Sequence, residues 1–198
     1  MRRSRAGAAA FTLVELMIVV ALVAIIAALA APSFRDMILV QRLRGINAQL
    51  ATDLAFARSE AVSRGVFVGV RTQLAAGTMS CYIINTRTTL AAPPCDCTAA
   101  AGSRCTVAAE TTEIRTVQVP TNLLVLLKVP AGQDDNFTFD PRTGGRKVTP
   151  SDLGVYDSSD FVIKAYIDDA RELNTAVRVS GRIAVCTPNT SRMGGPAC

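Results

Sequence analysis

The feature of this chain that most constrains its fold is an apolar run from Phe11 to Ala31. The run is about 20 residues long, which is the length of helix that crosses the hydrocarbon core of a bilayer. It contains one charged residue, Glu15, and a carboxylate in hydrocarbon costs about 2.5 to 3.5 kcal/mol on insertion scales. A charge placed at that cost indicates a function, so Glu15 is the first candidate functional residue.

Three interpretations of this run are open. It follows three arginines and contains the A-x-A site Ala28-Leu29-Ala30, as a secretory signal peptide would. A membrane anchor is the second interpretation and a buried helix is the third. Glu15 and the helical pattern beyond Pro32 argue against the signal peptide, and the length of the run argues against a buried helix.

A second helical segment follows the apolar run. Pro32 removes a backbone hydrogen bond and predicts a kink. Beyond it, apolar residues recur at spacings of three and four: Leu39, Leu43, Ile46, Leu50, Leu54, Ala57 and Ala61. Polar side chains fall largely elsewhere: Arg42, Arg44, Gln49, Asp53, Arg58 and Glu60. Gly65 suits a left-handed C-cap, so we expect one helix, apolar over residues 11–31 and amphipathic over residues 32–64.

The remainder of the chain, residues 65–198, has the pattern of an antiparallel sheet domain. Its period is two and its apolar residues are often β-branched. The expected strands are Val66–Arg71, Met79–Ile84, Glu113–Gln118, Leu123–Val129, Asn136–Asp140, Phe161–Ile167 and Thr175–Cys186. Residues 86–106 are rich in Ala, Pro and Cys without a period, which indicates a surface loop. The expected fold class is α+β, a long N-terminal helix packed on the sheet domain.

The chain has six cysteines, an even number downstream of an export-type segment, which favours disulfides in an oxidising compartment. We favour a bond between Cys186 and Cys198, which would hold the C-terminal tail to the last strand. A local bridge is expected within the loop cysteines Cys95, Cys97 and Cys105. The rival interpretation is a zinc site that includes Cys81, although the chain has no histidine and no C-x-x-C motif.

The sequence offers little catalytic chemistry. Without histidine, the chain lacks the usual general base and the commonest metal ligand. Carboxylates that would suit calcium are present without the EF-hand spacing: Asp134, Asp135 and Asp140. Residues 144–147, Gly-Gly-Arg-Lys, lack the spacing of a phosphate loop and are interpreted as a turn with solvated charges. We expect no enzyme activity, no cofactor and no metal.

The segment around Glu15 resembles a known export signal. Residues 10–16, Ala-Phe-Thr-Leu-Val-Glu-Leu, are similar to the class III signal of type IV pilins and type II secretion pseudopilins. In that family a prepilin peptidase cuts before the Phe and the new amine is methylated. The resemblance implies a leader over residues 1–10, cleavage between Ala10 and Phe11, and methylation of Phe11. The family usually has Gly before the cut, where this chain has Ala10.

The same resemblance implies a role for Glu15. In the family, the carboxylate at this position pairs with the new amine of a neighbouring subunit as helices pack into a filament. A buried charge without a partner is strongly unfavourable, so the pair would fix the register between subunits. The alternative is that Glu15 reaches the lipid headgroups and has no partner in the filament.

Two stretches of the sheet domain resemble the GspH/FimT group of minor pilins and H-type pseudopilins. Residues 137–144, Phe-Thr-Phe-Asp-Pro-Arg-Thr-Gly, are similar to the F-x-x-x-G turn of that group. Residues 177–186 are similar to its closing strand. Residues 43–64 of the predicted helix add to the resemblance.

The group also suggests a possible nucleic-acid contact. Some FimT-type pilins bind DNA through a Gly-Arg-x-Arg motif whose arginines contact phosphates. Here the matching segment, residues 181–184, is Gly-Arg-Ile-Ala, so Arg182 is kept and the second Arg is Ala. Arg178 and Arg192 are the basic residues that would compensate. We favour the alternative, in which Arg178 and Arg182 line the solvent face of an edge strand.

These resemblances imply a structural protein, a minor pilin of a bacterial type IV pilus in the tip or priming complex. They imply a single-pass precursor in the inner membrane with a periplasmic domain, which later joins a pilus or pseudopilus at the cell surface. The expected partners are other major and minor pilins, prepilin peptidase and the inner membrane, and DNA is not favoured. The alternatives are an H-type pseudopilin of a type II secretion system, a DNA-binding minor pilin, and a secreted protein cut after Ala30.

Overall fold

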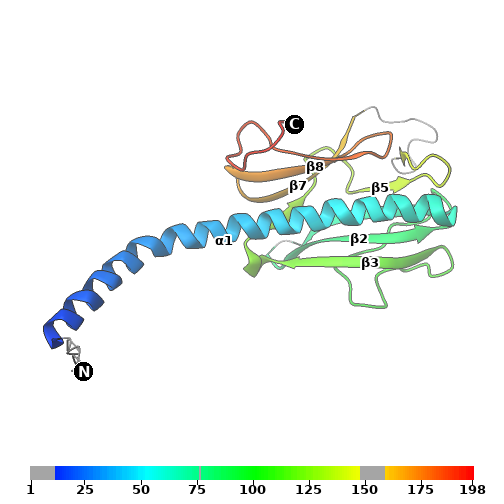
Figure 1. Cartoon of the computed structure of the whole chain (residues 1–198). Coiled ribbons are helices and arrows are strands. Elements are labelled where there is room, and N and C mark those ends of the chain that lie inside the picture. The colour runs from blue at the N-terminus through cyan, green and yellow to red at the C-terminus, as the bar shows by residue number, and fades with distance from the viewer. Residues whose placement is uncertain (1–11, 76, 148–158) are drawn as a thin grey trace, which may run out of the picture. The chain divides into compact units, whose positions relative to one another are not determined.

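The computed structural model describes residues 12–75, 77–147 and 159–198, and gives the backbone alone for residues 29–33. The chain divides into two compact units, one ending at Ile38 and the other beginning at Leu39. Helix α1 (Leu13–Arg64) contributes to both units, and all strands belong to the second (Figure 1).

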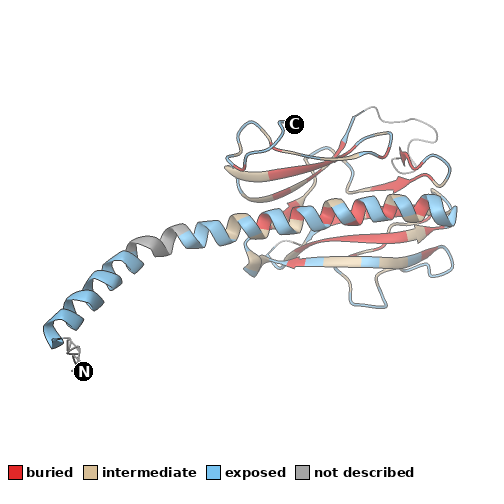
Figure 2. Cartoon of the chain, in the orientation of Figure 1, coloured by how far each residue is buried: buried red, intermediate tan, exposed pale blue. Residues whose placement is uncertain are grey.

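In the first unit, α1 is exposed on every side. The described side chains from Leu13 to Ala28 are all exposed, as the pale blue ribbon in Figure 2 shows. Apolar residues occupy every face of this segment, a pattern typical of helices that are surrounded by protein or lipid. Among the residues that the structure describes, no helix meets the length and hydropathy expected of a membrane span. The backbone is helical through Pro32, and the predicted kink there stays a prediction.

In the second unit, the predicted apolar stripe of α1 forms part of the core. Five of its residues are completely buried: Leu43, Leu50, Leu54, Ala57 and Ala61. The helix ends at Arg64, and Gly65 follows with a φ of 65°, in the left-handed conformation that the sequence predicts. A glycine adopts this φ without steric cost, so the chain can leave the helix sharply toward the first strand.

Two antiparallel sheets pack against this half of α1 (Figure 1). The first sheet has the strand order β3-β2-β1-β5-β6 and consists of β1 (Phe67–Ala75), β2 (Met79–Arg87), β3 (Thr111–Pro120), β5 (Asn136–Phe139) and β6 (Arg146–Lys147). The second has the order β4-β7-β8-β9 and consists of β4 (Leu126–Lys128), β7 (Phe161–Asp168), β8 (Arg171–Val177) and β9 (Ile183–Cys186). A short 3-10 helix, η1 (Thr121–Leu123), joins β3 to β4. The α+β class expected from the sequence is therefore the observed one.

The predicted strand Thr175–Cys186 is wrong. The chain reverses between β8 and β9, where the N–H of Arg178 donates to the carbonyl of Arg182 at 2.9 Å. Gly181 has a φ of 77° in this turn, a conformation that a continuous strand does not contain. The closing strand expected over residues 177–186 is thus a tight turn followed by a short edge strand.

The interpretation of residues 144–147 as a solvated turn is also wrong. Arg146 and Lys147 form β6, which pairs with β5, and Arg146 is only 2% exposed. The guanidinium of Arg146 lies over the ring of Phe161, 6.0 Å from its centroid. The side chain of Arg146 is therefore buried within the domain. The strand to which it belongs, β6, is only two residues long.

All six cysteines are paired. The bonds are Cys81–Cys97, Cys95–Cys105 and Cys186–Cys198, so the last is the pair that the sequence favours and the second is the local bridge. The zinc interpretation is wrong, because these bonds leave no cysteine thiolate free to bind the metal.

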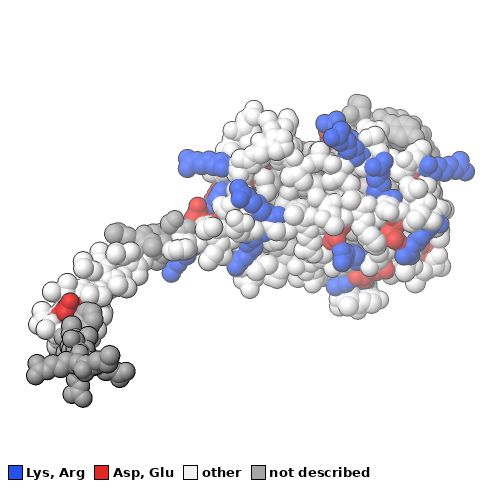
Figure 3. All heavy atoms as spheres, viewed as in Figure 1, with Lys and Arg blue, Asp and Glu red and all other residues white. Residues whose placement is uncertain are grey.

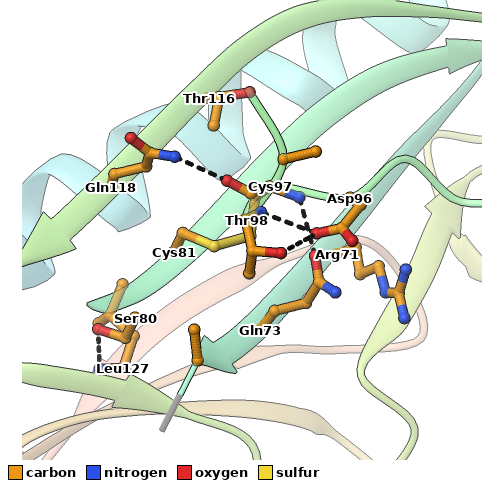
Figure 4. The surroundings of a disulfide bond; sticks show 12 residues. Arg71, Gln73, Ser80, Cys81, Asp96, Cys97, Thr98, Thr116, Gln118 and Leu127 are labelled. Carbon is orange, nitrogen blue, oxygen red and sulfur yellow. Dashed lines mark hydrogen bonds between the residues drawn. A yellow bond between two sulfur atoms is a disulfide. The ribbon is translucent and has the colours of Figure 1, made fainter. Parts of the chain in front are cut away.

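The Cys81–Cys97 bond attaches the cysteine-containing loop to the first sheet (Figure 4). The N–H of Cys97 donates to Gln73 Oε1 at 2.8 Å, and Gln118 Nε2 donates to the carbonyl of Cys97 at 2.9 Å. Cys81 and Ile83 form a small cluster with the loop cysteines, whereas the alternate residues of β2 face the core that contains α1. The loop thus covers the face of the sheet opposite the helix.

Candidate functional site

Of the N-terminal site that the sequence predicts, the structure describes Glu15. Ala10 and Phe11 lie outside the described residues. Thr12 caps α1, because its Oγ1 accepts a hydrogen bond from the N–H of Glu15 at 3.2 Å. Glu15 is therefore in the first turn of the helix, where the positive end of the helix dipole favours a carboxylate. Its side chain is exposed, so a cation from outside the chain can reach it.

Three arginines of α1 attach the helix to loops of the second unit. Arg42 Nη1 donates to the carbonyl of Leu123 at 2.9 Å, and Arg44 Nη2 donates to that of Met193 at 3.1 Å. Arg58 donates from Nε to the carbonyl of Gly144 at 3.0 Å and from Nη2 to that of Ser180 at 3.1 Å. Hydrogen bonds from a charged group contribute about 1.5 to 3 kcal/mol each, so these contacts help to fix the helix on both sheets.

Two polar residues on the buried side of α1 were missed by the pattern of the sequence. Asp53 was expected to fall away from the core, and this is wrong, since it is 1% exposed. Its Oδ2 accepts a hydrogen bond from the hydroxyl of Tyr82 at 2.6 Å, and its Oδ1 forms an ion pair with Arg115. Asn47 accepts a hydrogen bond from the hydroxyl of Thr175 at 2.9 Å. Asp53 thus binds α1 to the first sheet, and Asn47 binds it to the second.

Burial of the Tyr82 hydroxyl raises the pKa of that group, and the hydrogen bond to Asp53 raises it further. The phenol therefore stays protonated and acts as a donor to the carboxylate. A buried polar network whose members are satisfied specifies one arrangement of the elements that carry it. We infer that this network sets how α1 lies on the strands.

The two stretches of the sheet domain that resemble the GspH/FimT group touch each other. The N–H of Arg146 donates to the carbonyl of Val179 at 2.9 Å, which links the end of the β5–β6 turn to the β8–β9 turn. Gly181 approaches so closely that a Cβ on it would lie 1.9 Å from the carbonyl oxygen of Gly144. Arg58 reaches both turns, so the last turns of α1 and one end of each sheet meet at this point.

The three arginines considered for DNA contact are not gathered at one place. Arg178 and Arg182 are exposed in the β8–β9 turn, and Arg178 Nε lies 3.8 Å from a carboxylate oxygen of Asp160. Arg192 lies beyond the other end of β8, where its N–H donates to the carbonyl of Ala170 at 2.7 Å. A strand of this length spans about 23 Å. The edge-strand position favoured for Arg178 and Arg182 is wrong, because both lie in the turn.

Two of the three carboxylates considered for calcium are paired with separate cations. Asp135 Oδ2 lies 2.8 Å from Arg71 Nε, and Asp140 forms an ion pair with Lys147. Asp134 is exposed in the loop before β5. Within the described ranges, no group of three or more metal-ligating side chains is close enough to hold a metal ion.

Asp140 has a structural role at the β5–β6 turn. Its Oδ1 accepts hydrogen bonds from the N–H groups of Arg142 at 2.8 Å and Thr143 at 3.2 Å. Burial by itself raises the pKa of this carboxyl, but the hydrogen bond from Lys147 and the two backbone N–H groups outweigh it, so the pKa is lowered. The charged form is thus more stable in the folded chain than in the unfolded chain.

We predict that Asp140→Asn destabilises the protein most at neutral pH. A carboxyl with a lowered folded pKa adds stability above its unfolded pKa of about 3.9, and this is lost as the pH falls through the folded pKa. The loss in unfolding free energy, about 1 to 3 kcal/mol at pH 7, should therefore shrink below about pH 4. Urea unfolding measured from pH 7 to pH 2.5, an acidic range near the carboxyl pKa, tests this. Asp134→Asn is the control, and a cost for Asp140→Asn that stays constant with pH would contradict the prediction.

The described features define a class of protein in which an exposed apolar N-terminal helix continues into a helix packed on antiparallel sheets. The family model described as "Type II transport protein GspH" matches residues 47–182, and the model "Prokaryotic N-terminal methylation motif" matches residues 5–31. The first match covers more than half of the chain, which therefore belongs to the GspH family. The resemblance to the GspH/FimT group is confirmed. The methylation motif and the family imply processing by prepilin peptidase and assembly with other pilins into a pilus or pseudopilus.

Among solved structures, two crystal forms of the type IV minor pilin FimU from Pseudomonas aeruginosa are similar to this chain, each with 16% sequence identity. One match has a TM-score of 0.45 and covers 72% of this chain and 90% of FimU. The other has a TM-score of 0.48 and covers 73% and 88%, respectively. No curated protein sequence matches the chain.

Proposed function

We propose that this chain is a minor pilin, a structural and non-enzymatic subunit that takes part in the priming or tip complex of a type IV pilus. The observation that carries the proposal is the exposed apolar segment of α1, which has Glu15 in its first turn. The second unit buries its own core, so it does not need this segment for its packing. A segment with this composition requires an apolar environment supplied by lipid or by other helices.

The proposal begins with a precursor in the inner membrane. Residues 11–31 would form the transmembrane half of the helix, and the domain that follows would lie in the periplasm. The three disulfides support this location, because disulfides form and persist in oxidising compartments such as the periplasm. Prepilin peptidase would remove residues 1–10, and the amine of Phe11 would then be methylated.

Assembly would replace lipid by the helices of other major and minor pilins. In this state the carboxylate of Glu15 would pair with the amine of Phe11 on an adjacent subunit. The pair has an electrostatic function alone: it neutralises two charges that are costly in an apolar interior and thereby fixes the register between subunits. No reaction is required of the described domain.

The experiment that tests processing is mass spectrometry of the mature N-terminus, on protein extracted from membranes. We expect a chain that begins at N-methylated Phe11. A chain that begins at Ala31 would overturn the proposal, because cleavage there removes Glu15 together with the apolar segment. Ala10→Gly, which restores the residue usual in the family, is the control and should be processed at least as completely.

A second function is favoured by the description of the matching family, which names a type II transport protein. In this alternative the chain is an H-type pseudopilin with the same processing and the same use of Glu15. Deletion of the gene distinguishes a role in the type IV pilus from a role in the type II secretion system. Loss of surface pili with normal protein secretion supports the pilus, whereas defective secretion with normal pili supports the type II system. Dominance of this chain in sheared filaments would contradict its role as a minor subunit.

A further inference from the structure

The second sheet carries a cavity on the face that is turned away from α1. Its volume is about 480 Å³, within the range of pockets that hold ligands in proteins. Thr175 of β8 donates a hydrogen bond to Asn47 of α1, so the side chain of Thr175 faces the helix. Successive residues of a strand point to opposite faces, so Asn174 and Ala176 face away from the helix, where both line the cavity.

Small side chains form the floor of the cavity. Ala176 pairs with Val162 of β7 and with Ala184 of β9, so these three residues form one row across the sheet. All three line the cavity. Because alanine side chains are short, the sheet is hollow along this row, and larger groups on both sides of the row form walls.

The C-terminal tail forms one wall of the cavity. Residues 196–198 line it, and the bond between Cys186 and Cys198 attaches them to β9. The N–H of Thr187 also donates to the carbonyl of Pro196 at 2.8 Å. Figure 3 shows an uncharged surface over the end of this tail, whose residues 193–198 have no charged side chain. This wall is therefore uncharged and is held in place by a disulfide.

Two arginines and one aspartate form the opposite wall. Arg178 and Arg182 line the cavity together with Asp160. The N–H of Arg178 donates to the carbonyl of Arg182 at 2.9 Å, so the two residues lie opposite each other in the turn that follows the alanine row. Arg178 Nε lies 3.8 Å from a carboxylate oxygen of Asp160, and Arg182 is exposed. Two guanidinium groups against one carboxylate give this wall net positive charge.

Asn174 contributes a hydrogen-bond acceptor without a donor. The residue is only 8% exposed, and its Nδ2 donates to Cys198 Sγ at 3.6 Å. Among the residues that the structure describes, none donates to Asn174 Oδ1. A buried acceptor without a donor is unfavourable, and an N–H group of a ligand that reaches it removes this cost. The cavity therefore suits a ligand that carries both an anionic group and an N–H donor.

We propose that this cavity binds an acidic peptide segment of another subunit. A carboxylate side chain of the segment would bind Arg182, an apolar part would pack on the alanine row, and a backbone N–H would donate to Asn174 Oδ1. Asn174 and Arg178 are separated by about 13 Å along an extended strand, which a peptide of about three or four residues can span. The identity of the partner as another subunit rests on the proposed function, whereas recognition of an acidic peptide does not.

The chemistry of the cavity favours an acidic peptide over nucleic acid. The phosphate backbone of DNA has no N–H donor for Asn174 Oδ1, and its contacts are made mainly with cations. Asp160 adds a negative charge to the basic wall, which repels phosphates. The alanine row offers an apolar surface that a peptide side chain can cover and that a phosphate group cannot use.

NMR of the full chain in detergent micelles, with the alanine methyl groups isotopically labelled, tests the proposal. The probe is an acetylated pentapeptide, Gly-Val-Glu-Val-Gly, and the matched control peptide has Gln in place of Glu. We expect the Glu peptide to shift the methyl resonances of Ala176 and Ala184, and to bind at least about tenfold more tightly than the Gln peptide. The methyl resonance of Ala109, exposed in the loop before β3, should not shift.

Two matched arginine variants test the basic wall. Arg182→Gln should weaken binding of the Glu peptide by about tenfold or more, because it removes a charged donor. Arg182 is exposed, so its replacement leaves the core intact. Arg192→Gln is the control, since Arg192 is also exposed but does not line the cavity, and this variant should bind the Glu peptide normally. Equal weakening by both substitutions would show attraction by overall charge and would overturn the proposal.

The remaining outcomes are also distinct. Ala184→Phe fills the cavity from β9 and should abolish the shift of the Ala176 methyl resonance. Equal binding of the Glu and Gln peptides, or no shift with either, overturns the proposal. Tighter binding of duplex DNA than of the Glu peptide at the same methyl groups indicates a nucleic-acid site and overturns it as well.

Failure of peptide binding leaves the proposed function standing, because the NMR measurement requires neither cleavage before Phe11 nor assembly. A mature chain that begins at Ala31 has the opposite meaning. It would overturn the proposed function, while binding of the Glu peptide by the sheet domain would still be expected.

Discussion

Replacement of Glu15 by alanine is expected to prevent incorporation of this chain into filaments while its membrane association remains. In the proposed filament, the variant would leave the amine of a neighbouring Phe11 buried without its carboxylate. Removal of one partner from a buried ion pair costs about 3 to 5 kcal/mol, which corresponds to a decrease of more than about 100-fold in the assembly equilibrium. The amount of the chain in sheared filaments and in membranes, measured by immunoblot, tests the prediction.

Replacement of Glu15 by alanine should favour membrane association, although it disfavours assembly into filaments. A carboxylate in a membrane-spanning segment costs about 2.5 to 3.5 kcal/mol, so its removal makes insertion more favourable. Val14→Ala, a change in the same exposed turn without a change in charge, is the control and should assemble normally. Normal assembly of Glu15→Ala would support the alternative in which Glu15 only reaches the headgroups. Loss of the variant from membranes would contradict the proposed role in another way, because it would make Glu15 a requirement for insertion.

The amphipathic half of α1 could be predicted from the sequence because its apolar residues follow the helical period. Leu43, Leu50 and Leu54 are buried as that period requires. Asp53 could not be placed in the same way. Its burial depends on Tyr82 and Arg115, which come from two strands distant in the sequence and are brought to the helix only by the pairing of β2 with β3. A periodic pattern records polarity and contains no information about such a partner.

The turn between β8 and β9 was missed for a related reason. Alternation of apolar residues continues on both sides of Gly181, so a period of two describes one long strand as well as two short ones. What decides between them is the contact of this glycine with Gly144, which lies in the β5–β6 turn of the other sheet. The arginines of the candidate DNA site were likewise close in sequence, yet β8 and the returning C-terminal tail place Arg192 away from Arg178.

One disulfide could be predicted from the sequence, whereas the partner of Cys81 could not. Cys186 and Cys198 are separated by 12 residues along the tail, and their bond follows from the need to hold that tail. The partner of Cys81 could not be chosen from sequence spacing. It depends on which face of β2 carries Cys81 and on the loop returning across that face, with Gln73 and Gln118 holding Cys97 from the two adjacent strands.

The substitution Gly181→Ala is expected to destabilise the domain by roughly 3 kcal/mol or more, the sum of two separate costs. The left-handed backbone, with a φ of 77°, costs alanine about 1 to 2 kcal/mol. In addition, the new Cβ would lie 1.9 Å from the carbonyl oxygen of Gly144 and 2.9 Å from Arg58 Nε. The turns must then separate, which weakens the hydrogen bond between Arg58 and Gly144. Urea unfolding followed by circular dichroism measures the total loss in the free energy of unfolding.

The comparison that isolates the contact is Gly77→Ala. Gly77 has a φ of 80°, close to that of Gly181, but a Cβ on it would meet no atom within 4 Å. This variant should lose only the backbone contribution, about 1 to 2 kcal/mol. If both substitutions cost the same, the close approach of the two turns would have no energetic importance.

A double-mutant cycle then tests whether Arg58 transmits the effect. Arg58→Ala by itself removes the hydrogen bonds to Gly144 and Ser180. If Gly181→Ala acts partly by displacing the Gly144 carbonyl from Arg58, it should cost less in the Arg58→Ala background, by about 0.5 to 3 kcal/mol. Additive costs would mean that the steric contact of the turns acts independently of the helix. A clear coupling would mean that the close approach of the two glycines holds the carbonyls of Gly144 and Ser180, in the β5–β6 and β8–β9 turns, where Arg58 can bind them.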